Sequence, residues 1–466
     1  MIRKYFLLIN LCLFVASTFV ACSKKLDEPV PDTAIGEQTL KPADLALLVK
    51  GAYSKIHAGW PSQTYPLFDI YADDIISMQG GSITRFNPQA YDACNPNPSD
   101  GFSNGFYYNG AYTAIGNANT VINYIRSREL TGQNKDLGEA LGIRGYCYLR
   151  LVEAYKGVII TLGSNEDPAE LKRPQNTEEE VFNRIITDLK EAEKLLPPFS
   201  TPDALSKEAV QLLLARIYLN RGDKVEAKKY AEAVIGSTSA ALTSDFSSNF
   251  RYNNPENKEL LFRVVEGPVS SSYDRAGMFP LFSPGLPYRR PTGATGNGQT
   301  WVNADLVNAY EAGDVRAGLF KNQMAASVGR VVTYLMKFSL DTLQDANSFV
   351  TYPLIRLSEA YLISAEADAR QDVVNVTRYN AVRQKRNASP KTTGDFPSAA
   401  NFLQEIEMER RKEFLGEGLR WQDMKRFGKA IPFLSSKGQN ETRLYLPFVN
   451  AELNRNPKLV QNNGYK

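Results

Sequence analysis

The chain has 466 residues, and its 54 basic and 51 acidic side chains leave a formal net charge of +3. Nucleic-acid binding relies on clustered lysine and arginine, so this near-neutral balance argues against a nucleic-acid partner. The chain has one histidine, His57, and four cysteines, which are too few residues to favour a conventional zinc site or a Ser–His–Asp triad. The length suits one large helical domain or two smaller ones.

The N-terminus predicts a secreted, lipid-anchored protein. Arg3 and Lys4 precede an uncharged, mostly apolar run over residues 6–20. This run is shorter than the roughly 20 apolar residues of a membrane span, but it fits a secretory signal. A small residue precedes Cys22, as a lipoprotein signal requires, so Cys22 is the predicted lipidation site. The alternative is an ordinary cleaved signal with an incidental cysteine.

We therefore divide the chain into three predicted parts: a lipoprotein signal peptide over 1–21, a lipidated tether over 22–40, and a single domain over 41–466. Two cysteines, Cys94 and Cys147, remain in the domain. They cannot form a disulfide framework, although one bridge between them is possible. Cys147 falls on an apolar helical face and is more typical of a buried thiol.

Apolar residues that recur every three or four positions predict a series of amphipathic helices. The predicted helices cover residues 41–56, 111–125, 138–155, 177–196, 206–221 and 224–235. Thr177 and Ser206 are predicted N-caps, and Glu180 completes a capping box. The segment 209–235 carries a tetratricopeptide-like pattern of small residues and tyrosines, with weaker echoes at 144–155 and 357–386. The sequence thus predicts an all-α fold of paired helices.

Two regions escape the helical pattern. Residues 60–112 are about twice as rich in aromatic side chains as the chain's 11% average, and residues 267–301 combine aromatics with several prolines. Short strands at 260–265 and 331–338 are predicted to flank the second region, with a short helix at 303–310. Irregular segments of this length within a compact protein are usually functional.

The most distinctive stretch runs from Arg410 to Arg426 and reads R-R-K-E-F-L-G-E-G-L-R-W-Q-D-M-K-R. Before its turn, Phe402, Ile406 and Phe414 share one helical face. Gly416 and Gly418 then predict a helix end with positive φ. Dense charge on both sides of this turn favours interlocking ion pairs that fix the angle between two helices, rather than catalysis.

This stretch resembles the C-terminal signature of the SusD/RagB-like lipoproteins, outer-membrane glycan-capture proteins of Bacteroidota, which reads R-x-x-E-F-x-G-E-G-x-R-W-x-D-x-x-R. Every fixed position is matched, from Arg410 through Glu413 and Trp421 to Arg426. The resemblance implies a superhelical scaffold of tetratricopeptide-like helix pairs with long irregular loops and a few short strands. It also implies a lipid-anchored, surface-exposed protein that delivers oligosaccharides to a SusC-like TonB-dependent transporter, without catalysis or cofactor.

A pyranose offers an apolar C–H face and a rim of hydroxyls, so its capture needs an aromatic platform and a few polar side chains. The two irregular regions supply both. The candidate glycan-binding residues are Trp60, Asp73, Arg85, Tyr91, Tyr273, Tyr288 and Trp301. We predict no catalytic residue and no metal ligand. The sequence does not specify which glycan is bound, or whether a calcium ion orders residues 95–100.

Two rival functions remain. Tetratricopeptide-like helix pairs also grip protein segments, so the chain could be a protein–protein adaptor. A glycoside hydrolase is the less favoured rival, because it needs two carboxyl groups placed across a sugar bond, which a sequence cannot show.

Overall fold

The computed structural model describes residues 40–57, 67–77, 88–99, 103–163, 172–251, 254, 256–266, 300–325, 328–338 and 350–465. Residues 46–466 form one compact unit. The predicted signal peptide, Cys22 and the tether up to residue 39 lie outside the described residues. Within the described part, none of the helices combines the length and the apolar character that a bilayer crossing requires.

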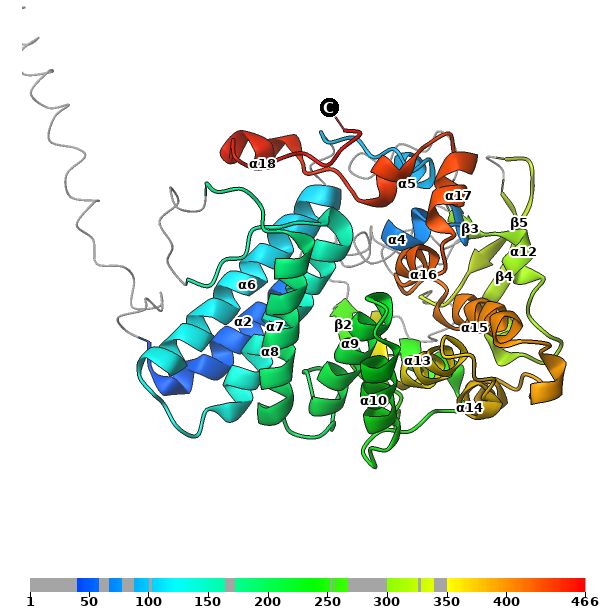
Figure 1. Ribbon diagram of the computed structural model, residues 1–466, viewed down its shortest axis with the longest axis horizontal. Coiled ribbons are helices and arrows are strands. Elements are labelled where there is room, and N and C mark those ends of the chain that lie inside the picture. Colours follow the sequence, from blue (N-terminus) through cyan, green and yellow to red (C-terminus); the bar gives the residue numbers. More distant parts are fainter. Residues whose placement is uncertain are drawn as a thin grey trace, which may run out of the picture. The chain divides into compact units, whose positions relative to one another are not determined.

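Helices dominate the compact unit, which confirms the predicted all-α class. The longer helices are α2 (Leu45–His57), α6 (Ser103–Ser127), α7 (Asn134–Tyr155), α8 (Glu178–Leu195), α9 (Lys207–Asn220), α10 (Lys224–Ile235), α13 (Leu357–Ala369), α14 (Val376–Lys385) and α15 (Ala399–Phe414). From α6 to α10 each helix packs on the next, and α13 then packs on α10, α14 and α15 (Figure 1). This succession of packed neighbours is the tetratricopeptide-like scaffold that the sequence predicts.

Shorter elements complete the described part. The short helices are α4 (Leu67–Ile70), α5 (Pro88–Asp92), α12 (Ala304–Val307), α16 (Arg420–Arg426), α17 (Ala430–Ser436) and α18 (Asn450–Arg455). The 3-10 turns are η1 (Pro42–Asp44), η2 (Phe246–Phe250), η3 (Val315–Leu319), η5 (Thr393–Asp395) and η6 (Glu441–Leu444).

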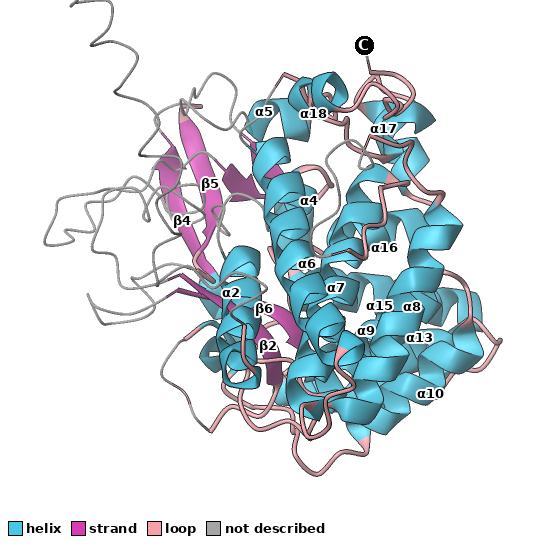
Figure 2. Ribbon diagram, turned by 90° about the vertical axis from the view of Figure 1, so that its left-hand side faces the viewer, coloured by secondary structure: helices cyan, strands magenta, loops and turns pink. Residues whose placement is uncertain are grey.

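In the residues that the structure describes, three two-stranded antiparallel sheets lie to one side of the packed helices (Figure 2). They pair β1 (Ile75–Ser77) with β3 (Thr300–Val302), β2 (Leu260–Glu266) with β6 (Val350–Arg356), and β4 (Phe320–Ala325) with β5 (Arg330–Leu335). The strands predicted at 260–265 and 331–338 are confirmed as β2 and β5, although β5 ends at Leu335.

Two boundaries differ from the predictions. Helix α6 begins at Ser103, so residues 103–112, which we expected to be irregular, are helical. Glycines and asparagines lower the helix propensity of this stretch, but Tyr107 and Tyr108 are buried, and their packing outweighs the propensity. The helix predicted at 303–310 is limited to α12, where Asn303 caps its first turn.

The predicted helix caps are confirmed. The Thr177 Oγ1 atom accepts a hydrogen bond from the backbone N–H of Glu180 at 3.3 Å, and the Thr177 N–H donates to Glu180 Oε2 at 2.8 Å. Ser206 Oγ likewise accepts from the N–H of Ala209 at 3.2 Å. Each cap satisfies donors that the first helical turn leaves unpaired.

Thr177→Ala is expected to lower the free energy of unfolding by about 1 kcal/mol, because the first turn of α8 loses its hydrogen-bonded cap. Urea titration followed by circular dichroism measures the change. Thr187→Ala in the same helix is the matched control, since Thr187 Oγ1 donates only to the Asn183 carbonyl oxygen within an exposed turn. An equal loss in both variants would contradict the capping role of Thr177.

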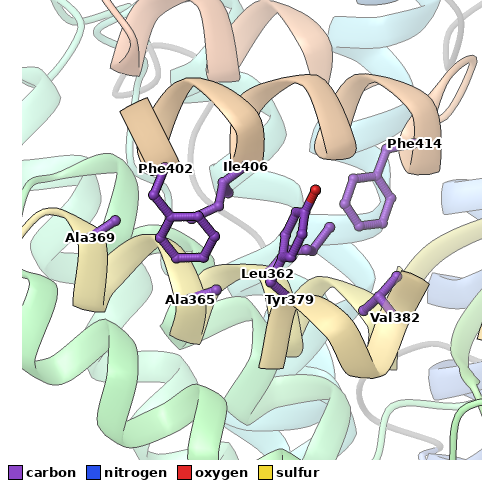
Figure 3. Close-up of a cluster of buried hydrophobic side chains, with 8 residues drawn as sticks. All are labelled: Leu362, Ala365, Ala369, Tyr379, Val382, Phe402, Ile406 and Phe414. Atoms are coloured by element: carbon purple, nitrogen blue, oxygen red, sulfur yellow. The ribbon is translucent and has the colours of Figure 1, made fainter. Parts of the chain in front are cut away.

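The face predicted for α15 is confirmed as a core surface. Phe402, Ile406 and Phe414 point from α15 towards Leu362, Ala365 and Ala369 of α13 and Tyr379 and Val382 of α14 (Figure 3). Phe402 is fully buried and lies edge-on to Tyr379, with ring centroids 5.5 Å apart. Burial of these rings holds α15 in place, and thereby the charged residues on its other faces.

Cys94 and Cys147 are both buried and unbridged. Burial raises the pKa of each thiol to about 12, so both remain protonated at neutral pH. The interpretation of Cys147 as a buried thiol is confirmed.

Candidate functional site

The ladder between β1 and β3 joins the two aromatic-rich regions. β1 lies within the first region and β3 ends the second, and their antiparallel register places Ile76 opposite Trp301 and Ser77 opposite Thr300. Because the strands are antiparallel, the residue after Ser77 and the residue before Thr300 are attached at the same end of the ladder. Segment 78–87 therefore begins where segment 267–299 ends, at neighbouring backbone positions, although the two are far apart in the sequence.

Three of the seven predicted glycan-binding residues lie in the described part. Trp301 is 5% exposed and packs in a cluster with Val332, Tyr334 and Met336. Tyr91 in α5 is 0% exposed. In this structure both rings are covered by protein and offer no open face to a ligand. Asp73 is half-buried and faces an arginine.

The other four candidates, Trp60, Arg85, Tyr273 and Tyr288, lie outside the described residues. Arg85 belongs to segment 78–87, and both tyrosines belong to segment 267–299. These three residues thus lie on the two segments attached at the Ser77–Thr300 end of the ladder. Their role in binding stays a prediction.

The bend between α4 and β1 is held by carboxylates that bind the C-terminal signature. Asp73 receives two hydrogen bonds from Arg420, at 2.6 and 2.7 Å. Asp74 Oδ1 accepts from Arg411 Nη2 at 2.5 Å. The backbone N–H of Gly418 donates to Asp69 Oδ2 at 2.5 Å. The signature therefore fixes the strand from which segment 78–87 departs.

Electrostatics in this bend are set by burial and by the arginines. Burial pushes the pKa of Asp73 upward, but its hydrogen bonds with Arg420 outweigh this effect, and the pKa is lowered. Burial and the neighbouring Asp73 charge raise the pKa of Asp74 to about 6, despite Arg420 and Arg411. Burial also raises the pKa of Asp69 well above its usual value. Arg420 and Arg411 thus pair with Asp73 and Asp74, whereas Asp69 is held by the backbone N–H of Gly418.

The predicted ion pairs between the two signature helices are confirmed. Arg410 on α15 binds Asp423 on α16 through two hydrogen bonds, at 2.8 and 3.0 Å. Between the helices Gly416 and Gly418 both adopt φ of +79°, as the sequence predicts. An added Cβ at Gly416 would lie 2.8 Å from Leu335 Cδ2, so a side chain there would collide as well as strain the backbone.

A second buried network surrounds Glu413. Its carboxylate binds Arg356 and Arg386 at 2.8 Å each and Arg316 at 3.1 Å. All four side chains are at most 1% exposed. These arginines come from the end of β6, the end of α14 and from η3, so one carboxylate ties three distant segments to α15.

Acid is expected to destabilise the chain by protonating the buried carboxylates of Glu409 and Asp423. Burial alone would raise the pKa of Glu409, but Arg316 and Lys412 outweigh it and hold the pKa at about 2, and Arg410 and Arg426 do the same for Asp423. Both folded values lie below the unfolded values of about 4. Their stabilisation is therefore present above about pH 4.5 and lost as the pH falls towards 2. Urea midpoints that stay constant from pH 5 to 3 would contradict this assignment.

Sequence reasoning missed Asp69, Asp74 and Arg411. Adjacent acids such as Asp73 and Asp74 carry no signal of their own in a chain with 51 acidic residues. The partner of Asp73 lies 347 positions later in the chain, so no local pattern could connect them. In the described residues, no group of three or more His, Cys, Asp or Glu side chains is arranged to hold a metal ion.

Comparison with known proteins gives two family matches. Residues 30–219 match a SusD-like family described as starch-binding and associating with the outer membrane, and residues 331–465 match the SusD family. A SusD-like protein of Formosa agariphila is 22% identical over 94% of this chain and 95% of its own length. The starch-binding protein SusD of Bacteroides thetaiotaomicron is 26% identical over 65% of this chain and 68% of its own.

A solved structure of a laminarin-binding SusD-like protein superposes with a TM-score of 0.77 at 21% identity. The alignment covers 91% of this chain and all of that one, so the two share the fold over most of their length. The two family matches and these relatives indicate the same family as the intact signature around Glu413. The chain belongs to the SusD/RagB family.

Proposed function

We propose that this protein captures oligosaccharides at the outer membrane and hands them to a SusC-like TonB-dependent transporter, without cleaving them. The observation that carries the proposal is the β1–β3 register, which joins the two aromatic-rich regions, 60–112 and 267–301, at neighbouring backbone positions. Aromatic faces on such segments suit the C–H face of a pyranose, and nearby Asp, Asn and Arg side chains suit its hydroxyls. A starch-binding relative and a laminarin-binding protein of the same fold support this ligand class.

The rigid frame has a defined part in this function. Buried ion pairs to Asp73 and Asp74 hold the strand that starts one segment, and the Trp301 cluster holds the strand that ends the other. A binding surface assembled on fixed attachment points loses less conformational entropy when the ligand arrives. In this proposal Trp301 acts as a packed anchor beside the platform, and Trp60, Tyr273 and Tyr288 supply the exposed rings.

A binding screen of the full chain tests the function. The panel contains laminarihexaose, maltohexaose, an oligogalacturonide and unrelated peptides, measured by isothermal titration calorimetry. Saturable binding of at least one saccharide, recovered uncleaved after prolonged incubation, is the expected result. Binding of peptides alone would favour the protein–protein adaptor instead, and cleavage of a bound saccharide would favour a hydrolase.

The membrane anchor is tested separately. Cys22→Ala removes the only thiol that the predicted signal places for lipidation. We expect the variant to leave the membrane fraction and appear in the soluble fraction of expressing cells, because the lipid chains supply the membrane affinity. Cys94→Ala is the matched control and should stay with the membranes. An unchanged distribution of the Cys22 variant would contradict lipid anchoring.

A further inference from the structure

A cavity lies away from the β1–β3 ladder. It has a volume of about 600 Å³ and is lined by residues from the first half of α6, the connector after α7 and the C-terminal tail around α18. This volume falls within the range of small-molecule sites. Tyr108 belongs to the aromatic-rich region of the sequence, but neither it nor any other residue of this cavity is among the candidate glycan-binding residues.

The floor of the cavity is aromatic and apolar. Tyr108, Tyr112, Ile159 and Leu459 line it. Tyr112 is only partly buried and stays in place because its hydroxyl donates to the Ile159 carbonyl oxygen at 2.7 Å. Tyr108 lies edge-on to Tyr155, with ring centroids 5.5 Å apart. The rings are thus fixed before any ligand arrives.

The wall formed by the C-terminal tail is also fixed. Asn456 Nδ2 donates to the Arg173 carbonyl oxygen at 2.8 Å. Gln175 and Val460 exchange two hydrogen bonds, at 2.8 and 3.0 Å. These bonds join the tail to the connector across more than half of the sequence, so the cavity is a built feature of the fold.

The rim carries polar groups that the protein itself does not use. The side chains of Asn109, Lys172 and Asn454 are exposed, line the cavity, and make no hydrogen bond or ion pair within the described part of the chain. Glu452 pairs through Oε1 with Arg455 at 2.6 Å, which leaves its second oxygen as an acceptor. Amides, an ammonium and a carboxylate together offer both donors and acceptors.

This combination selects among ligand classes. A sugar hydroxyl both donates and accepts, so it can use the amides of Asn109 and Asn454 and the carboxylate of Glu452 alike. A phosphate accepts only, and would meet that carboxylate as a like charge. A fully apolar ligand would leave the rim groups without partners at the mouth of the cavity.

We propose that this cavity is a second saccharide subsite, which holds one or two sugar units against the partly exposed ring of Tyr112 and the Asn109–Lys172–Asn454 rim, with Tyr108 buried beneath. The proposal rests on the proposed glycan-binding function and adds a site that is independent of segments 78–87 and 267–299. Two sites on one chain would raise the apparent affinity for a long polysaccharide, because the second contact becomes intramolecular.

The test combines a rim variant with hydrogen exchange. In the unmodified full chain, laminarihexaose, maltohexaose or the oligogalacturonide is expected to slow backbone exchange in residues 107–115 and 450–460. The triple variant N109A/K172A/N454A should keep its urea midpoint, because these exposed side chains make no hydrogen bond or ion pair within the described part of the chain. It should lose that protection and bind the saccharide at this site about tenfold more weakly.

A matched control replaces three exposed side chains that do not line this cavity: N134A/K55A/N183A should behave like the unmodified chain. Saccharide binding that leaves exchange in 107–115 and 450–460 unchanged would overturn the second subsite and leave the proposed function intact. Loss of the protection in both triple variants would also overturn it. Failure of the unmodified chain to bind any saccharide would contradict the proposed function itself.

Discussion

Replacing Glu413 by alanine is expected to lower the free energy of unfolding by about 3–5 kcal/mol. The Glu413 carboxylate is fully buried and neutralises Arg356, Arg386 and Arg316 at once. Its removal leaves guanidinium groups in a dry environment with one fewer negative charge, and neither water nor a mobile side chain can replace it. Urea unfolding of the full chain at pH 7 measures the loss.

A matched control separates this effect from the removal of any ion pair. Arg126 and Glu191 form a 2.7 Å pair on the surface, with side chains 46% and 38% exposed. Glu191→Ala should therefore cost less than about 1 kcal/mol. A similar small cost for Glu413→Ala would show that the buried network does not hold the scaffold together.

Arg420→Met is the second change with a large expected effect, again about 3–5 kcal/mol of unfolding free energy. It leaves Asp73 without its two hydrogen bonds and leaves Glu407 without the 2.9 Å bond from Arg420 Nη1. Because Asp73 lies two residues before β1, the attachment point of segment 78–87 becomes less fixed. We therefore expect weaker saccharide binding as well as lower stability.

A double-mutant cycle identifies the cause. Asp73→Asn removes the charge that Arg420 neutralises, so the double variant D73N/R420M should be more stable than the sum of the two single losses predicts, by about 1 kcal/mol or more. Additive losses would mean that Arg420 acts through its packing rather than through its pairing with the carboxylate.

Sequence patterns predicted the parts of this fold whose causes are local. Helix α10 spans the predicted residues, and the capping box at Thr177 is present because its two partners are three residues apart. The face of α15 followed from the spacing of Phe402, Ile406 and Phe414. The positive φ of Gly416 and Gly418 could be predicted because glycine adopts such angles without strain.

The remaining features depend on contacts between distant segments. The pairing of Asp73 with Arg420 leaves no trace in either local sequence, and the same holds for the tail that closes the Tyr112 cavity. Tyr91 and Trp301 illustrate the limit for single side chains. An aromatic residue in a polar stretch has the same pattern whether it packs inward or faces solvent, and here both rings are packed.

The central claim is that one saccharide contacts both aromatic-rich regions, 60–112 and 267–301. Its most direct test is the dissociation constant of the full chain for the best saccharide of the screen, measured for Trp60→Ala and Tyr288→Ala, with Phe433→Ala on α17 as the aromatic control. Loss of a stacked ring should weaken binding about tenfold in each of the first two variants and leave the control unchanged. Unchanged affinity in both test variants would contradict the account.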